Sequence, residues 1–450
     1  MKKNFLTLGI LMMSVAFTPL CLTSCDDDDD DTTTDDDEDE EEEEEETVID
    51  FADVIDVYVN DVVYPTYTNL ANQTTNLYTE LINVQTNLEA GVLTQSDIDA
   101  ACTTFLEARA YWEESEAWLY GPADQFGIDP HIDTWPLDRS ELAGILGSDE
   151  LRANLEGDIE DAIVYISEQN GEVSHLGFHG IEFILFRDGE NRTVEDLEGI
   201  EEDDAFADVT VTGDYELSYA IAVAGDLRDW TCYLEVAWKG DAAASSHISR
   251  CETRDFQLIL DGIDNYYGDE MLLAGNGSEL YEYEVEAINA ILIDGCSNIC
   301  AEVADQKMGQ PYRAAKGTAT SEEMSDDEYV GKDYIESPYS HKSFTDFYDN
   351  IMSIKNAIYG NIEGDTYEEN SIMGYLALNN SDMAEELDDD LQDALDALQA
   401  CIDYGVAFVT IINNTTTYSD GMDLVQEAMD EIDDLDEYIN EASDWISKNY

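Results

Sequence analysis

A short apolar segment of the chain carries one histidine and one glutamate. Residues 177–186 have the sequence Gly-Phe-His-Gly-Ile-Glu-Phe-Ile-Leu-Phe. If they form a helix, His179 and Glu182 stand side by side at positions i and i+3, and apolar residues cover nearly all of the circumference, which predicts a buried helix. A buried carboxylate costs several kcal/mol unless it is paired, protonated or bound to a cation. We therefore expect Glu182 to have a partner in the interior.

A second set of carboxylates offers such partners. Glu113 and Glu116 also stand at i and i+3, in a helix predicted over residues 94–120. Glu116 follows Trp112 by four residues, which turns it by about 40° from the apolar stripe of that helix and points it inward. Either Asp129 or Asp133, in the proline-containing loop that follows, could supply a further oxygen.

Carboxylates on one helix that face a histidine and a carboxylate on another are typical of metal sites in helical bundles. A histidine with several carboxylates suits iron, zinc or manganese and, less well, calcium. The sequence thus predicts a divalent or trivalent metal ion with six candidate ligands, namely Glu113, Glu116, Asp129, Asp133, His179 and Glu182. The alternative is a buried hydrogen bond between His179 and Glu182 without a metal.

Known catalytic motifs are not present. His175 lies four residues before His179, but Leu176 stands where the zinc protease pattern H-E-x-x-H needs its glutamate, so the general base is missing. The sequence has no glycine-rich phosphate loop and no G-x-S-x-G elbow. Serine hydrolase and nucleotide chemistry are therefore unsupported.

The elements that must position these residues are helices. Apolar residues recur at helical spacing almost throughout, for example after the start signal at residues 94–97. The exception is residues 207–212, whose β-branched alternation predicts a strand within the polar stretch 188–214. We expect an all-α protein.

An internal similarity suggests how the helices are grouped. Residues 105–121 align with residues 344–360 at a constant offset, and both segments are predicted to be helices closed by a glycine C-cap. Met352 and Lys355 take the positions of Glu113 and Glu116, so the metal site would exist in one copy only. This duplication predicts two lobes, each an up-and-down bundle of the four-helix type, over residues 47–205 and 206–450.

These motifs together resemble the imelysin family, also classed as M75 peptidases, over roughly residues 50 to 440. The family signature G-x-H-x-x-E is matched by Gly177, His179 and Glu182. The similarity also includes residues 108–118, Gly121-Pro122, residues 129–137 and residues 336–340, which are Glu-Ser-Pro-Tyr-Ser.

The resemblance implies two helical bundles with the signature pocket where they meet. It also implies a periplasmic or outer-membrane protein, and several members of the family are linked to iron uptake. The family's proposed metal ligands fall on Glu113, Glu116, His179 and Glu182, with Asp129 or Asp133 as an addition. The family name records a peptidase activity, although the site resembles no standard metallopeptidase.

The N-terminus predicts a lipoprotein. Residues 1–24 have the charged start, the apolar run and the small residues of a signal peptide, and Cys25 lies where the lipobox of bacterial lipoproteins places its lipidated cysteine. Residues 25–46 are almost entirely acidic and should form a disordered tether. Such a tail resembles the surface-export signals of some Gram-negative lipoproteins. We expect an outer-membrane lipoprotein at the cell surface, or otherwise on the periplasmic face.

The net charge and the cysteine content limit the kinds of partner that we expect the protein to bind. The formal net charge is −88, which disfavours nucleic acid and anionic lipid surfaces and favours cations. The six cysteines after Cys25 allow several pairings, and free buried thiols or one disulfide are expected. The sequence therefore favours a protein that captures a metal ion, most simply iron, free or chelated. A metal-dependent peptidase and a purely structural adhesin or scaffold are the alternatives.

Overall fold

The computed structural model describes residues 48–168, 174–321, 323–325, 329–362 and 364–450. The predicted signal peptide, Cys25 and the acidic tether lie outside these residues. Residues 49–450 form one compact unit. The all-α prediction is confirmed. The described residues contain many helices and a single two-stranded sheet, in which β1 (Phe186–Arg187) pairs with β2 (Glu190–Asn191).

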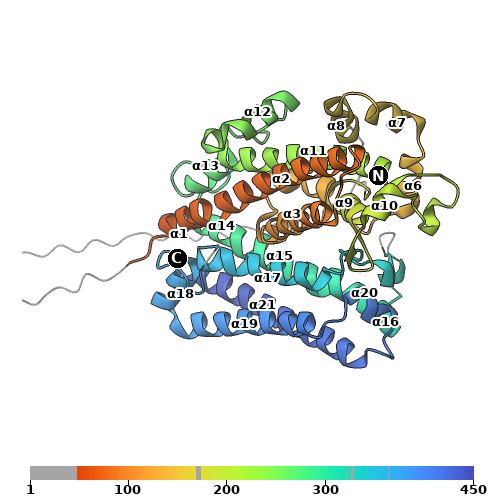
Figure 1. Cartoon of the computed structure of the whole chain (residues 1–450). Helices are drawn as coiled ribbons and strands as arrows, with labels where there is room; N and C mark the ends of the chain where they lie inside the picture. Colours follow the sequence, from red (N-terminus) through yellow and green to blue (C-terminus); the bar gives the residue numbers. More distant parts are fainter. Residues whose placement is uncertain (1–47, 169–173, 322, 326–328, 363) are drawn as a thin grey trace, which may run out of the picture. The chain divides into compact units, whose positions relative to one another are not determined.

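The long helices lie in two layers (Figure 1). In the upper layer, α2 packs against α3 and α11. In the lower layer, α19 packs against α17 and α21, and α17 also contacts α3 above it. The bounds of these helices are α2 Tyr64–Glu89, α3 Gln95–Glu113, α11 Gly213–Lys239, α17 Ser343–Tyr359, α19 Ser381–Asp403 and α21 Ser419–Asn449.

Shorter helices complete the fold around these six. Before α11 they are α1 Phe51–Val57, α4 Pro122–Gln125, α5 Asp129–Ile132, α6 Arg139–Leu146, α7 Asp149–Leu155, α8 Ile159–Ser167, α9 Gly177–Leu185 and α10 Val194–Glu198. After α11 they are α12 Ser245–Arg254, α13 Tyr267–Leu272, α14 Glu284–Asn289, α15 Asn298–Ala301, α16 Gly309–Lys316, α18 Ile372–Asn379 and α20 Phe408–Asn413.

The helical stretch from α14 to α16 contains two π-helical segments, η5 (Ala290–Ser297) and η6 (Glu302–Met308). This stretch, Glu284–Lys316, is long and apolar enough to span a membrane by composition, but 61% of its apolar window is buried inside the fold. Core helices of soluble proteins meet the same criterion, and we regard it as a core helix.

Local signals explain where the helices begin and end. α3 starts after a capping box in which Thr94 and Asp97 bond each other's backbone, as its sequence predicts. α17 ends at Gly360, whose φ of +76° suits a glycine C-cap. The predicted strand over residues 207–212 is wrong: only Thr212 makes a bridge, with Ile200, before α11 begins.

The proposed boundary between residues 205 and 206 stays a prediction. α11 lies after that boundary and packs along α2, which lies before it. The upper layer therefore combines residues from both predicted lobes.

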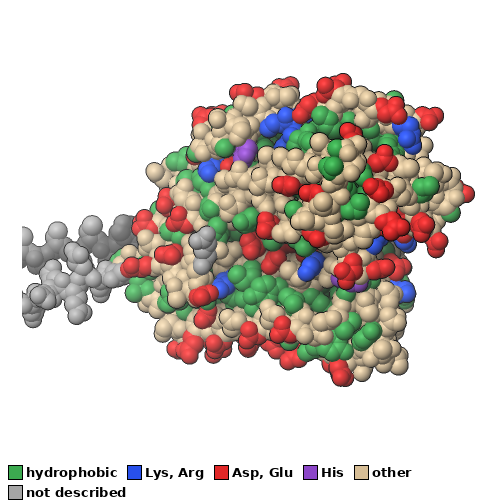
Figure 2. All heavy atoms as spheres, in the orientation of Figure 1, with side chains coloured by type: hydrophobic (Ala, Val, Ile, Leu, Met, Phe, Trp, Pro, Cys, Tyr) green, Lys and Arg blue, Asp and Glu red, His purple; other side chains and the backbone are tan. Residues whose placement is uncertain are grey.

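Figure 2 shows carboxylates spread over the visible face of the molecule with few lysines and arginines among them, which matches the strongly negative sequence.

Candidate metal centre between the helical layers

The signature helix α9 is buried along its whole length, as predicted. His179 is 2% exposed and Glu182 is 1% exposed. Two glycines make this packing possible. A Cβ on Gly177, whose φ is +55°, would lie 1.8 Å from the carbonyl oxygen of Ile132, and a Cβ on Gly180 would lie 2.0 Å from that of His175. The signature glycine is thus explained by close backbone contact with the end of α5.

Glu113 and Glu116 are both buried, but they do not share one helix. The prediction of a helix running to Tyr120 is wrong, because α3 ends at Glu113 and Glu116 opens a short 3₁₀ segment, η2 (Glu116–Trp118). The cause lies in α17, where the Ser353 hydroxyl accepts a hydrogen bond from the Ala117 amide at 3.0 Å. This tertiary contact replaces an intrahelical bond.

The buried side chains form two overlapping groups of possible metal ligands. One ligand atom each from Asp133, His179 and Glu336 lie within 4.8 Å of one another. The same holds for Glu113, Glu116, Asp133 and Glu336. We call these five residues the acidic cluster. The structure therefore brings together four of the six predicted ligands and adds Glu336.

Glu336 is not among the six ligands predicted from the sequence. It begins the Glu-Ser-Pro-Tyr-Ser stretch at residues 336–340 noted above, and that stretch was the available signal. Glu336 is fully buried, although it lies 227 residues from Arg109, to which it is hydrogen-bonded.

Glu182 lies outside both groups. Its Oε1 accepts hydrogen bonds from the Tyr339 amide at 3.1 Å and from the Ser340 amide and hydroxyl at 2.8 and 2.7 Å. Its Oε2 lies 3.9 Å from His179 Nδ1. Glu182 thus fixes the segment that carries Glu336 and stands behind the histidine, which is the usual place for a carboxylate that orients a metal-binding imidazole.

Asp129 and Asp133 differ in position. Asp133 is buried, and its Oδ2 accepts a hydrogen bond from Trp112 Nε1 at 2.7 Å. Asp129 begins α5, is only partly buried and belongs to neither group. Burial, and then repulsion by Asp133, raise the pKa of Asp129 to about 8. Of the two aspartates between which the sequence could not choose, the structure brings Asp133 into the cluster.

Two basic side chains lie among these carboxylates, and the sequence reasoning overlooked both. Arg109, on α3, forms ion pairs with Asp133, Glu113 and Glu336, the last at 2.6 Å. Arg109 also lies 3.8 Å from a carboxylate oxygen of Asp346 on α17. The buried carboxylates therefore do not depend on a bound cation alone, because the chain supplies positive charges of its own.

Lys307 is the second internal cation. It is completely buried, and its Nζ lies 2.8 Å from Glu116, 3.3 Å from Glu336 and 3.8 Å from Glu113. Lys307 belongs to the π-helix η6. Single π-helical turns occur often at functional sites, and the wider turn changes the register of the side chains, which a search for regular helical periodicity does not anticipate.

Burial and neighbouring charges both shift the pKa values of the cluster residues. Burial acts to raise the pKa of Asp133, but Arg109 and His179 hold it below its usual range. Burial acts to lower the pKa of His179, but Asp133 and Glu182 raise it to about 9. Burial raises the pKa values of Glu113 and Glu116 despite the neighbouring cations. The cluster has four carboxyl groups against the two basic side chains of Arg109 and Lys307, so a proton or a further cation is needed to neutralise the rest.

Buried atoms without hydrogen-bond partners indicate whether a metal ion fits the cluster. Within the described residues, one side-chain atom each of Glu113, His179, Glu182 and Glu336 is buried without a hydrogen-bond partner, although Glu113 Oε1 is ion-paired with Arg109 and Glu336 Oε2 lies 3.3 Å from Lys307 Nζ. His179 Nε2 lies 3.0 Å from Asp133 Oδ1, but the contact lacks hydrogen-bond geometry. Such atoms are costly unless a ligand satisfies them. An imidazole nitrogen and carboxylate oxygens are suitable donors for iron, manganese or zinc.

Other candidate groups have structural roles. His175 Nδ1 lies 2.7 Å from the Tyr219 hydroxyl, and burial lowers the pKa of this imidazole to about 4. Cysteines 102, 232, 251, 296, 300 and 401 are all free and buried. Cys296 and Cys300 do not join any of the ligand groups found among the described residues. The expectation of free buried thiols is confirmed for these positions.

Comparisons with known proteins identify the family of the chain. The family model for imelysin matches residues 63–438. The chain is 35% identical over 132 residues to "Iron-regulated protein A" of Synechococcus elongatus, a match that covers 29% of this chain and 31% of that protein. The chain thus spans about a third of the length of this curated relative.

Two solved structures share the fold. A putative iron-regulated protein A precursor from Parabacteroides distasonis has a TM-score of 0.62 at 24% identity, over 88% of this chain and 94% of that one. An imelysin-like protein from Psychrobacter arcticum has a TM-score of 0.52 at 13% identity, over 87% of this chain and 95% of that one. With a family model that covers most of its length, this chain belongs to the imelysin family.

Proposed function

We propose that this protein is a lipoprotein of the bacterial envelope that binds a metal ion, iron in the first place, in the acidic cluster. The observation that carries the proposal is a set of buried atoms of His179, Glu113 and Glu336 that, among the described residues, lack hydrogen-bond partners and meet only charged groups, those of Asp133, Arg109 and Lys307 respectively. These atoms belong to groups whose possible ligand atoms lie within 4.8 Å of one another. A cation would satisfy them and reduce the excess negative charge.

Iron is favoured by two considerations. An imidazole with several carboxylates suits iron, although manganese and zinc share this preference. The relatives from Synechococcus and Parabacteroides are both named as iron-regulated proteins, which supports a role in iron acquisition. The metal would then be the cargo of the protein, and Asp133, His179 and Glu336 would hold it, with Glu113 and Glu116 beside them.

Titration of the purified protein with Fe(II) under anaerobic conditions, and with Mn(II), tests the proposal. We expect His179→Ala and Glu336→Gln to weaken binding by at least about tenfold, since each removes one ligand. His247→Ala is the matched control, because His247 is also a buried histidine beside a carboxylate, that of Glu235 on α11, away from the cluster. Equal affinities for the wild type and all three variants would refute metal binding at this site.

Membrane attachment is a separate part of the proposal, supported by the sequence alone. Lipid attached to Cys25 would anchor the protein, and the acidic tether would carry the folded part away from the membrane. We expect Cys25→Ala to abolish incorporation of labelled palmitate and to release the protein from the membrane fraction. Protease accessibility on intact cells then distinguishes the cell surface from the periplasmic face. Unchanged palmitate labelling of the variant would exclude Cys25 as the lipidation site.

A further inference from the structure

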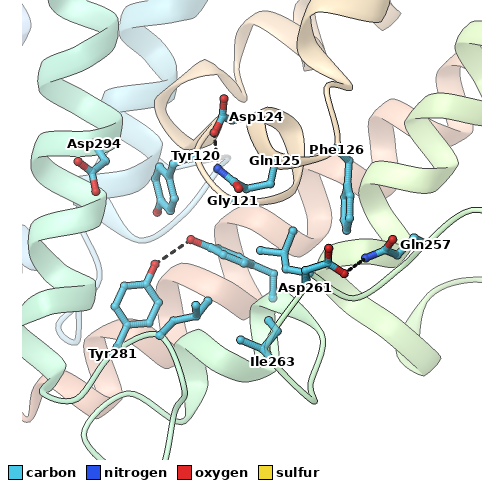
Figure 3. A pocket seen from close by; sticks show the side chains of 13 residues that line it. Tyr120, Gly121, Asp124, Gln125, Phe126, Gln257, Asp261, Ile263, Tyr281 and Asp294 are labelled. Atoms are coloured by element: carbon cyan, nitrogen blue, oxygen red, sulfur yellow. Dashed lines mark hydrogen bonds between the residues drawn. The ribbon is translucent and has the colours of Figure 1, made fainter. Parts of the chain in front are cut away.

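A pocket of about 590 Å³ lies outside the acidic cluster. It is formed by α4 and the residues just before it, the segment after α12, α13, the segment before α14, and η5 (Figure 3). None of its lining residues belongs to the acidic cluster. Its volume is in the range of about 300–1,000 Å³ that small-molecule sites occupy.

Aromatic rings form much of the wall. Tyr267 and Tyr281 are each at least nine-tenths buried, and their hydroxyls are hydrogen-bonded to each other at 2.8 Å (Figure 3). Tyr120 and Phe126 add two further rings. The Tyr267 ring lies against Gly121, where a Cβ would come within 2.5 Å of it. The rings are thus held in place by close packing.

The charged residues that line the pocket are all acidic. They are Asp124, Asp261 and Asp294, and the lining contains no lysine, arginine or histidine. Within the part of the chain that the structure describes, the carboxylates of Asp124 and Asp261 accept hydrogen bonds only from the side-chain amides of Gln125 and Gln257, at 2.6 and 3.0 Å (Figure 3). Among the described residues, none of the three carboxylates forms an ion pair, in contrast to the carboxylates around Arg109 and Lys307.

Asp294 is the carboxylate with the fewest contacts. It has no hydrogen-bond partner among the described residues, and partial burial raises its pKa. Its charge is also close enough to raise the pKa values of Tyr267 and Tyr281, after the larger effect of their burial. A positive group between Asp294 and the two rings would be attracted both by the carboxylate and by the electron-rich ring faces.

We propose that this pocket binds an organic cation, an amine that is charged as an ammonium ion and carries an apolar body. A bare metal ion fits less well, because the three aspartates do not form one of the close groups of ligand atoms found among the described residues. Carboxylates spaced around aromatic walls match a larger cation whose charge meets acid and whose body meets rings.

The test compares two probes of nearly equal shape on the purified protein. 2-Phenylethylammonium carries the charge, and 2-phenylethanol does not. Calorimetry should give at least about tenfold tighter binding for the ammonium ion, because only the charged probe gains from the carboxylates. Binding should weaken as salt is raised from 0.05 to 0.5 M, since the pocket is open to solvent and its charges are screened.

Single variants test which residues of the pocket bind the ammonium ion. Asp294→Asn should weaken ammonium binding by about tenfold, and Tyr281→Phe, which keeps the ring but removes the hydroxyl, by a few-fold. Asp53→Asn, an exposed aspartate on α1, is the matched control and should have no effect. His179→Ala should retain amine binding, so failure of the metal proposal would not affect this result.

Three outcomes would overturn the proposal. They are equal affinity for the two probes, equal effects of Asp294→Asn and Asp53→Asn, and binding of a neutral sugar such as N-acetylglucosamine without binding of the ammonium ion. The last outcome would identify a carbohydrate site, which also uses aromatic walls and carboxylates. Because Asp294 remains largely open to solvent, its amide variant should fold, and circular dichroism checks this.

Discussion

The Lys307→Met variant tests whether the lysine ammonium and a bound metal ion compete for the same carboxylates. The ammonium group lies 2.8 Å from Glu116 and 3.3 Å from Glu336. At an effective dielectric constant of about 20, each such pair attracts by about 5–6 kcal/mol before the cost of burying the ammonium ion is subtracted. Because removal of one partner from a buried ion pair costs about 3–5 kcal/mol, we expect Lys307→Met to lower the unfolding free energy of the metal-free protein by this amount.

Metal binding should change in the opposite direction. If a metal ion and Lys307 compete for the oxygens of Glu116 and Glu336, the variant should bind Mn(II) or Fe(II) at least about tenfold more tightly. With excess metal, a tenfold gain in affinity adds about 1.4 kcal/mol to the stabilisation that the metal confers on the folded protein. Urea unfolding with and without metal measures both effects.

Lys448→Met is the control for the loss of one positive charge, because Lys448 forms an exposed pair with Asp444 at 3.0 Å. Exposed pairs contribute about 0–1 kcal/mol, so this variant should unfold like the wild type. The reasoning fails if metal stabilises the Lys307 variant and the wild type equally, since the lysine would then not compete for the site. It also fails if Lys307→Met costs no more than the control.

Three further predictions concern the surroundings of the cluster. Gly177→Ala should destabilise the fold by more than about 3 kcal/mol in urea unfolding, because its Cβ would overlap a backbone oxygen, whereas Gly91→Ala, at a similar φ with open space around it, should cost about 1–2 kcal/mol. Equal losses would show that conformation alone explains the signature glycine. Glu182→Gln keeps an acceptor for the amide of Ser340 but loses its charge, so metal affinity should fall about 10- to 100-fold in calorimetric titration. Unchanged affinity would remove its role behind His179. The pKa of His175 is about 4 in the folded protein, below its ordinary value of about 6.5, so the folded state binds fewer protons and the stability due to the neutral imidazole is present above pH 6.5 and lost as pH falls towards 4. The urea midpoint of His175→Gln should therefore depend less on pH than that of the wild type between pH 6.5 and 4, and parallel curves would contradict the assignment.

The signature helix could be predicted because its sequence leaves little choice. A segment with apolar residues on all sides must be buried, and His179 and Glu182 are buried with it. The start of α3 was equally clear, since its capping box uses residues only three positions apart. Where the controlling interactions are local, periodicity and capping patterns were sufficient to place the helix and its polar residues.

The end of α3 and the positions of the two buried basic residues depend on contacts between distant parts of the chain. α3 ends at Glu113 because Ser353, far along the chain on α17, captures the Ala117 amide. Lys307 lies 191 residues from Glu116, and its side chain is directed by a π-helical register that regular spacing does not encode. A charged residue on a helix is usually exposed, so the burial of Arg109 and Lys307 could be inferred only from their partners in the folded structure.

The two internal cations are not equivalent, and the difference bears on how a metal ion could enter. Arg109 pairs with several carboxylates at once, and its guanidinium lies 5.1 Å from the centre of the Phe178 ring on α9. A planar guanidinium with several fixed partners is expensive to move, whereas a lysine ammonium is a compact charge on a flexible stem. The Lys307 ammonium also lies 3.9 Å from Glu302, which is partly exposed. We infer that Arg109 stays in place when a metal ion binds and that Lys307 is the charge the metal replaces, because Lys307 alone of the two has a carboxylate nearer the solvent to which it can withdraw.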